Sequence, residues 1–91
     1  MSYGTLTVDG TGSPFSIGSG SKHLRVHGTW GSGTFKLQIK QNDGNWSDIY
    51  MDGSAKTYTA DDEDIYDFVG PVNLRTVLTG STSPSLYWEV R

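Results

Sequence analysis

The chain has 91 residues, of which 34% are hydrophobic and none is cysteine, and its formal net charge is −3. This length corresponds to one domain with a small core. The acidic balance argues against a general nucleic-acid binder, which would carry a basic patch, and no stretch approaches the ~20 apolar residues of a membrane-spanning helix. Because cysteine is absent and the first residues lack a signal-peptide pattern, we expect assembly in a reducing compartment.

The first 21 residues are rich in glycine, serine and threonine. Within them Leu6 and Val8 alternate with polar residues, which predicts a short strand over residues 3–8. The rest is predicted as loop, as a frayed terminus, or as an extended arm that could add a strand to a neighbouring subunit. We therefore divide the chain into an N-terminal segment, 1–21, which is an arm or first strand, and a single domain over 22–91.

Short runs of alternating apolar and polar residues follow. Residues 35–40 are the clearest example, with Phe35, Leu37 and Ile39 on one face of a half-buried strand. Asp43-Gly44 suits a tight hairpin turn, so residues 46–51 should return as the partner strand. The other expected strands are residues 23–27, 56–60, 65–69, 72–79 and 85–91.

Strands that recur about every 8–12 residues, without helical periodicity, predict an all-β fold. We expect an antiparallel β-sandwich of seven or eight short strands, of either the jelly-roll or the immunoglobulin-like type. The sequence does not determine the strand order, and a one-residue slip in register would exchange the two faces of a strand.

Two groups of possible metal ligands are predicted to be ordinary surface residues. His23 and His27 would lie about 13 Å apart on a strand, too far to share a zinc ion with bonds of about 2.0–2.1 Å. The acidic run 61–64 lacks the spacing of a calcium loop, so we expect a solvated loop that would discourage aggregation if it lay on a sheet edge.

Motifs for catalysis are missing as well. The sequence has no nucleophile elbow, no phosphate-binding loop and no dinucleotide fingerprint. We therefore expect no enzymatic activity, no catalytic residues, no cofactor and no metal.

Aromatic residues make up 12% of the chain. If Ile49 and Met51 face the core, Trp46 and Tyr50 point the other way and are exposed together. An exposed aromatic pair could stack on a sugar ring or be covered by a protein partner.

Two parts of the chain resemble small structural proteins of tailed phages. One part begins at residues 28–38, which read Gly-Thr-Trp-Gly-Ser-Gly-Thr-Phe-Lys-Leu-Gln, and continues with Asp-Gly-Asn-Trp at 43–46. It is similar to a glycine-rich turn, strand and hairpin of that group. Residues 73–80 and 85–91 are similar to its closing pair of strands. The resemblance covers residues 28–91 and implies a capsid cement or decoration protein. Such proteins are β-rich and non-enzymatic, often trimeric, and placed on the capsid surface after assembly in the host cytoplasm.

The resulting hypothesis is a virion protein that binds and stabilises the lattice of the major capsid protein as a homo-oligomer, expected to be a trimer. No nucleic-acid or membrane partner is expected. The contact residues that we expect are Tyr3, Leu6, Val8, Phe15, Trp30, Trp46 and Tyr50. One alternative is a carbohydrate- or receptor-binding module that uses Trp46 and Tyr50 as a stacking platform. Another is a head–tail or tail accessory protein.

Overall fold

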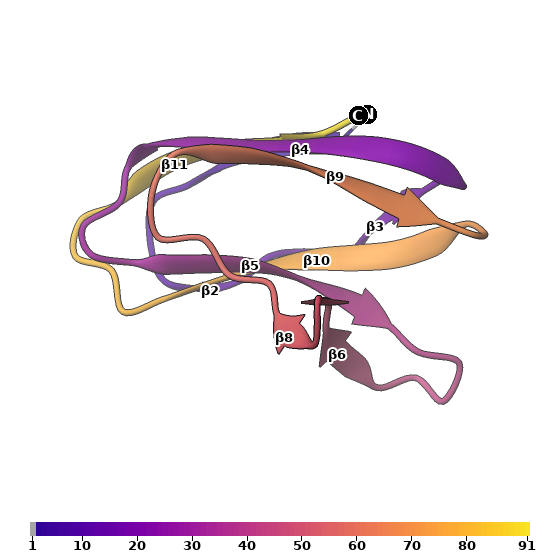
Figure 1. Ribbon diagram of the computed structural model, residues 1–91. Helices are drawn as coiled ribbons and strands as arrows, with labels where there is room; N and C mark the ends of the chain where they lie inside the picture. Colours follow the sequence, from indigo (N-terminus) through magenta and orange to yellow (C-terminus); the bar gives the residue numbers. More distant parts are fainter. Residues whose placement is uncertain (1) are drawn as a thin grey trace.

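The computed structural model describes residues 2–91, which form two antiparallel sheets packed face to face (Figure 1). Sheet A has the order β1-β11-β4-β9, with bounds Ser2–Leu6, Ser85–Val90, Gly20–Thr29 and Asp62–Phe68. Sheet B has the order β2-β10-β5-β6, with bounds Gly10–Thr11, Val72–Thr79, Thr34–Lys40 and Trp46–Asp48. None of residues 2–91 belongs to a helix long and apolar enough to cross a membrane.

The strand order identifies the type of sandwich. β2 and β3 (Phe15–Ile17) pair with opposite ends of β10, so together they act as one interrupted edge strand. If these two are counted as one strand and the small β7–β8 hairpin is left out, eight strands remain. Numbered from 1 to 8 in chain order, they lie in the order 1-8-3-6 in sheet A and 2-7-4-5 in sheet B. This is the order of a jelly roll. The predicted antiparallel β-sandwich is confirmed, and its jelly-roll form is the one observed.

The N-terminal segment is built into both sheets rather than standing apart as an arm. Apart from residue 1, which lies outside the described residues, its chain forms β1 along β11 and then β2 and β3 along β10. Ile17 is buried, and the boundary expected after residue 21 falls inside β4. The short strand expected over residues 3–8 corresponds to β1. Glycines and Pro14 interrupt the rest of this stretch, so β2 and β3 show no sustained alternation that could have revealed them.

The middle of the chain also departs from the expected strands. Residues 46–51 split into β6 and β7 (Tyr50–Met51), and β7 pairs with β8 (Ser54–Ala55) around a tight turn. The strand expected over 56–60 is reduced to a single bridge between Tyr58 and Phe35. Residues 62–64 of the acidic run, expected as loop, begin β9, which is an edge strand of sheet A.

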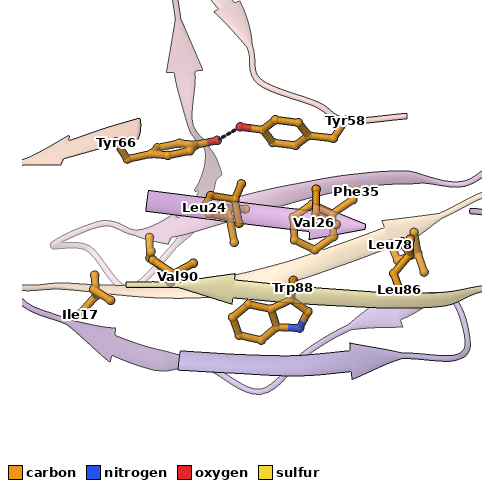
Figure 2. Close-up of a cluster of buried hydrophobic side chains, with 12 residues drawn as sticks. Ile17, Leu24, Val26, Phe35, Tyr58, Tyr66, Leu78, Leu86, Trp88 and Val90 are labelled. Carbon is orange, nitrogen blue, oxygen red and sulfur yellow. Dashed lines mark hydrogen bonds between the residues drawn. The ribbon is translucent and has the colours of Figure 1, made fainter. Parts of the chain in front are cut away.

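The core lies between the two sheets and consists of the apolar members of each alternating pattern. Its most deeply buried side chains are Phe35, Leu24, Leu37, Leu74, Leu78, Leu86, Val26 and Val90. Figure 2 shows part of this layer, with Trp88 beneath the β11 strand and the two tyrosines Tyr58 and Tyr66 on the opposite side. Because successive strand residues alternate, every buried position leaves a neighbour on the outer face of its sheet. The two outer faces are therefore built largely from the polar members of the same patterns.

Candidate functional site

The outer face of sheet A is a broad surface on which register brings distant residues together. In one row Tyr3 lies opposite Glu89, Glu89 opposite Arg25, and Arg25 opposite Glu63. In the next row Thr5 lies opposite Tyr87, and Tyr87 opposite His27. We call this surface the sheet A face and define it by Tyr3, Thr5, His23, Arg25, His27, Glu63, Ile65, Tyr87 and Glu89.

Three aromatic rings line up across the sheet A face. The ring centroids of Tyr3 and Tyr87 are 6.5 Å apart, and those of Tyr87 and His27 are 5.3 Å apart. Tyr3 is 67% exposed, although it is a large side chain. Desolvation, together with a hydrogen bond from the Tyr87 hydroxyl to Glu89 (3.2 Å), raises the pKa of Tyr87. The row combines apolar ring area with polar tips, a combination that is enriched at protein interfaces.

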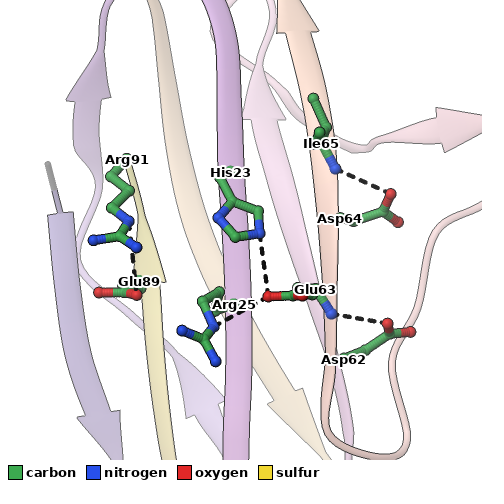
Figure 3. Close-up of polar contacts among 8 residues, drawn as sticks. All are labelled: His23, Arg25, Asp62, Glu63, Asp64, Ile65, Glu89 and Arg91. Carbon is green, nitrogen blue, oxygen red and sulfur yellow. Dashed lines mark hydrogen bonds and ion pairs between the residues drawn. The ribbon is translucent and has the colours of Figure 1, made fainter.

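Charges of both signs lie on the same face, and Figure 3 shows the ion pairs that they form. The Glu63 carboxylate lies 3.3 Å from His23 Nε2 and 3.2 Å from Arg25 Nε. The Glu89 carboxylate lies 4.0 Å from Arg91 Nε and is largely covered by its neighbours. The pairs of Glu63 with His23 and Arg25 are exposed, and exposed ion pairs contribute little to folding stability. They leave the face with a fixed pattern of charge that can orient a partner.

A shallow hollow of about 460 Å³ lies beside the aromatic row, lined by Arg25, Val26, His27, Asp61, Asp62 and Glu63. The Asp61 carboxylate accepts hydrogen bonds from Trp30 Nε1 (2.8 Å) and from the Gly28 amide (3.1 Å), which lower the pKa of Asp61. Among residues 2–91 no group of three or more His, Asp or Glu side chains is placed to hold a metal ion. The hollow is thus an open depression in the face, and its carboxylates already have partners within the chain.

A second concavity, of about 510 Å³, runs along the free side of β1. Its floor is Trp88, whose ring stacks on Phe15 with centroids 5.1 Å apart. Gly4 lies directly over Trp88, and a Cβ at that position would be 3.0 Å from the indole Nε1. We call this concavity the β1 groove. Its lining contains no charged residue: Ser2, Tyr3, Gly4, Thr5, Leu6, Gly12, Ser13, Pro14, Phe15, Thr76 and Trp88.

The seven residues expected to contact a partner do not form one surface. Tyr3 belongs to the sheet A face, and Leu6 and Phe15 are half-buried in the lining of the β1 groove. Val8 is 71% exposed in the loop after β1. Trp30 is half-buried and donates its indole N–H to Asp61.

The aromatic pair expected to be exposed together is divided between two hairpins. Trp46 is half-buried on β6, with the guanidinium of Arg75 4.5 Å from its ring centroid. Tyr50 is 66% exposed on β7. The chain leaves β6 before Tyr50, so Trp46 and Tyr50 do not continue one strand and do not form the expected platform.

His27 and Tyr87 were missed as candidate contact residues. The alternation of their strands places both outward, which is visible in the sequence. Their contact depends on the pairing of β4 with β11, and strand order is the property that the sequence left open.

Neither the protein-family models nor the curated proteins include a match to this sequence. Among solved structures, the chain is similar over its whole length to a de novo designed double-stranded β-helix studied by NMR in solution. The likeness covers 97% of that chain at 11% sequence identity, with a TM-score of 0.38. A likeness at this level carries no argument about function.

Proposed function

We propose that the chain is a non-enzymatic structural protein of a tailed-phage virion, of the capsid cement or decoration class. It binds the lattice of the major capsid protein as a homo-oligomer and contacts that lattice through the sheet A face. The observation that supports this proposal is the aromatic row of Tyr3, Tyr87 and His27, which lies open on a broad sheet surface.

The composition of the sheet A face suits a protein partner. Tyrosine and arginine are among the residues that most often carry binding energy at interfaces. Tyr87 and Arg25 lie on the two central strands, where the sheet holds their backbones in place. Ion pairs of both signs around them would favour one orientation on the partner over others.

A lattice changes the affinity that each contact must supply. One sheet face without a deep pocket binds weakly by itself, but an oligomer that engages several identical capsid sites gains avidity from effective concentration. This suits a small domain with many copies on a repeating surface. It also agrees with the resemblance of residues 28–91 to small phage structural proteins.

Co-sedimentation with expanded empty heads of the phage that encodes the chain tests this proposal. We expect saturable binding by the wild-type protein. The double variant Tyr87→Ser/His27→Ser should bind at least about tenfold more weakly, because two central contacts are truncated. Tyr50→Ser is the matched control, since it removes an exposed tyrosine that lies off the sheet A face.

Each outcome of this experiment can be read separately. Wild-type protein that stays in the supernatant at all concentrations would contradict a capsid function. Binding that survives Tyr87→Ser/His27→Ser but is lost in Tyr50→Ser would move the contact surface to the β7–β8 hairpin. Circular dichroism should show the same β-sheet spectrum for all three proteins, because these side chains lie outside the core.

A further inference from the structure

The two edges of sheet A differ sharply in charge. At one edge, β9 carries four carboxylates in seven residues: Asp62, Glu63, Asp64 and Asp67. At the other edge, β1 reads Ser-Tyr-Gly-Thr-Leu and carries no charge. Charged side chains on an edge strand are a recognised protection against pairing with another chain. The β9 edge has this protection and the β1 edge does not.

The free side of β1 has no partner within residues 2–91. β1 ends the sheet, and the backbone hydrogen bonds outside the strand ladders include none to residues 2–6. Tyr3 stands 67% exposed on this strand. An uncharged edge with unpaired N–H and C=O groups is a template for an added strand.

We propose that the occupant of the β1 edge is β1 of a second copy of this chain, paired antiparallel about a twofold axis at Gly4. This register uses all five residues of the strand. It places Tyr3 opposite Thr5 of the second copy and Ser2 opposite Leu6, so that no charges meet. Opposed residues of a strand pair point to the same face, so the two sheet A faces join into one surface.

The pairing closes at two copies. It consumes both uncharged edges and leaves a β9 edge at each end of a continuous eight-stranded sheet. Further growth would have to bring β9 against β9, with the carboxylates of both strands facing one another, which is unfavourable. An isologous interface of this kind gives a dimer and not a filament.

The dimer specifies the homo-oligomer of the proposed function and to that extent rests on it. The dimer would place two Tyr3–Tyr87–His27 rows on one surface. It differs from the trimer that the resemblance to phage proteins alone had suggested. The dimer is tested in solution without capsids. Failure of dimerisation and failure of capsid binding are therefore separate results.

Light scattering on a sizing column, with substitutions on each edge of sheet A, tests the proposal. We expect the wild-type protein to have about twice the chain mass of 9.9 kDa. Tyr3→Lys/Thr5→Lys and Tyr3→Glu/Thr5→Glu should each raise the dimer dissociation constant at least about tenfold, since like charges then oppose each other twice. An equimolar mixture of the two variants should recover the dimer mass, because each lysine then faces a glutamate. Ile65→Glu/Asp67→Glu on the β9 edge is the matched control for the glutamate variant and should remain dimeric, because it keeps that edge acidic.

A wild-type monomer at the highest soluble concentration, or a wild-type trimer, would overturn the proposal. So would a dimer that survives both charged variants, or variants that stay monomeric when mixed. If the charged variants do not fold, Tyr3→Cys/Thr5→Cys provides a second test, because the chain has no other cysteine. Facing residues of antiparallel strands have Cα atoms about 4.5–5.5 Å apart, within reach of a disulfide. Oxidation should give a covalent dimer, and its absence would overturn the register.

Discussion

The hydroxyl groups of Tyr58 and Tyr66 lie 2.6 Å apart and join the two sheets (Figure 2). Tyr66 belongs to β9 of sheet A, whereas Tyr58 exchanges two backbone hydrogen bonds with Phe35 of sheet B. The Tyr58 hydroxyl also lies 3.1 Å from Asp64 Oδ2, which itself lies 3.2 Å from Lys56 Nζ. An ionised carboxylate can only accept, so Tyr58 donates to Asp64 and Tyr66 donates to Tyr58.

This order of donors predicts unequal effects of two similar substitutions. Tyr66→Phe removes one donor and leaves Tyr58 bonded to Asp64, so unfolding free energy should fall by about 0.5–1.5 kcal/mol. Tyr58→Phe leaves the buried Tyr66 hydroxyl without its acceptor, and should cost about 1–3 kcal/mol and more than the first change. Urea unfolding followed by tryptophan fluorescence measures both. Equal losses, or a larger loss for Tyr66→Phe, would contradict the assigned direction.

The same pair predicts a loss of stability at alkaline pH. Burial raises the pKa of Tyr66 to about 12 and raises that of Tyr58 still further above the ordinary value. A group whose folded pKa is raised contributes stability that is complete below the unfolded pKa of about 10 and is lost as pH rises through the folded pKa. The urea midpoint should therefore fall between about pH 10 and pH 12, and less steeply in Tyr66→Phe.

Absorbance at 295 nm supplies the check on this alkaline prediction. Tyr58 and Tyr66 should ionise together with unfolding, at a pH above the ordinary tyrosine pKa of about 10. Ionisation of Tyr58 and Tyr66 near pH 10 while the protein remains folded would show that the buried pair is not protected.

Gly28 is predicted to tolerate no side chain. Its φ angle is +134°, and a methyl group there would collide with the carbonyl oxygen of Ser85 on β11. Gly28→Ala should lower the unfolding free energy by about 2 kcal/mol or more, from backbone strain and the displaced strand. Gly18→Ala is the matched control, because no atom lies within 4 Å of the added methyl. Thermal unfolding at one fixed protein concentration should separate the two, and equal melting temperatures would contradict this account.

The N-terminal segment is predicted to be essential for folding. Deletion of residues 1–20 removes β1, β2 and β3, including buried Ile17 and the stack of Phe15 on Trp88. We expect the shortened chain to lose its cooperative unfolding transition. The smaller change Phe15→Ala should leave a folded protein that is less stable by about 2 kcal/mol. A truncated protein with an unchanged transition would show that this stretch is a dispensable arm after all.

The strands that could be predicted from sequence are those that supply several apolar residues to the core. Residues 35–40 and 72–79 alternate over their whole length, because one face of each is buried and the other is wet. β2 and β3 are too short to show a period. β9 begins with three acidic residues, and the partners that stabilise two of them, Lys56 and Arg25, come from other parts of the chain.

For the candidate site, the sequence predicts which side chains point outward but not which of them are neighbours. Alternation places His27 and Tyr87 outward, but they become neighbours only because β4 pairs with β11. Trp46 illustrates the opposite case. It points outward as expected, yet Arg75 from β10 covers its ring, and no local pattern in the sequence relates these two residues.

Electron cryomicroscopy of expanded heads incubated with the wild-type protein tests the central claim most directly. We expect ordered density on the outer capsid surface, with the sheet A face turned toward the major capsid protein and Tyr87 and His27 at the contact. Heads without added density, or density in which the protein meets the capsid through sheet B or the β7–β8 hairpin, would contradict the proposed function or its contact surface, respectively.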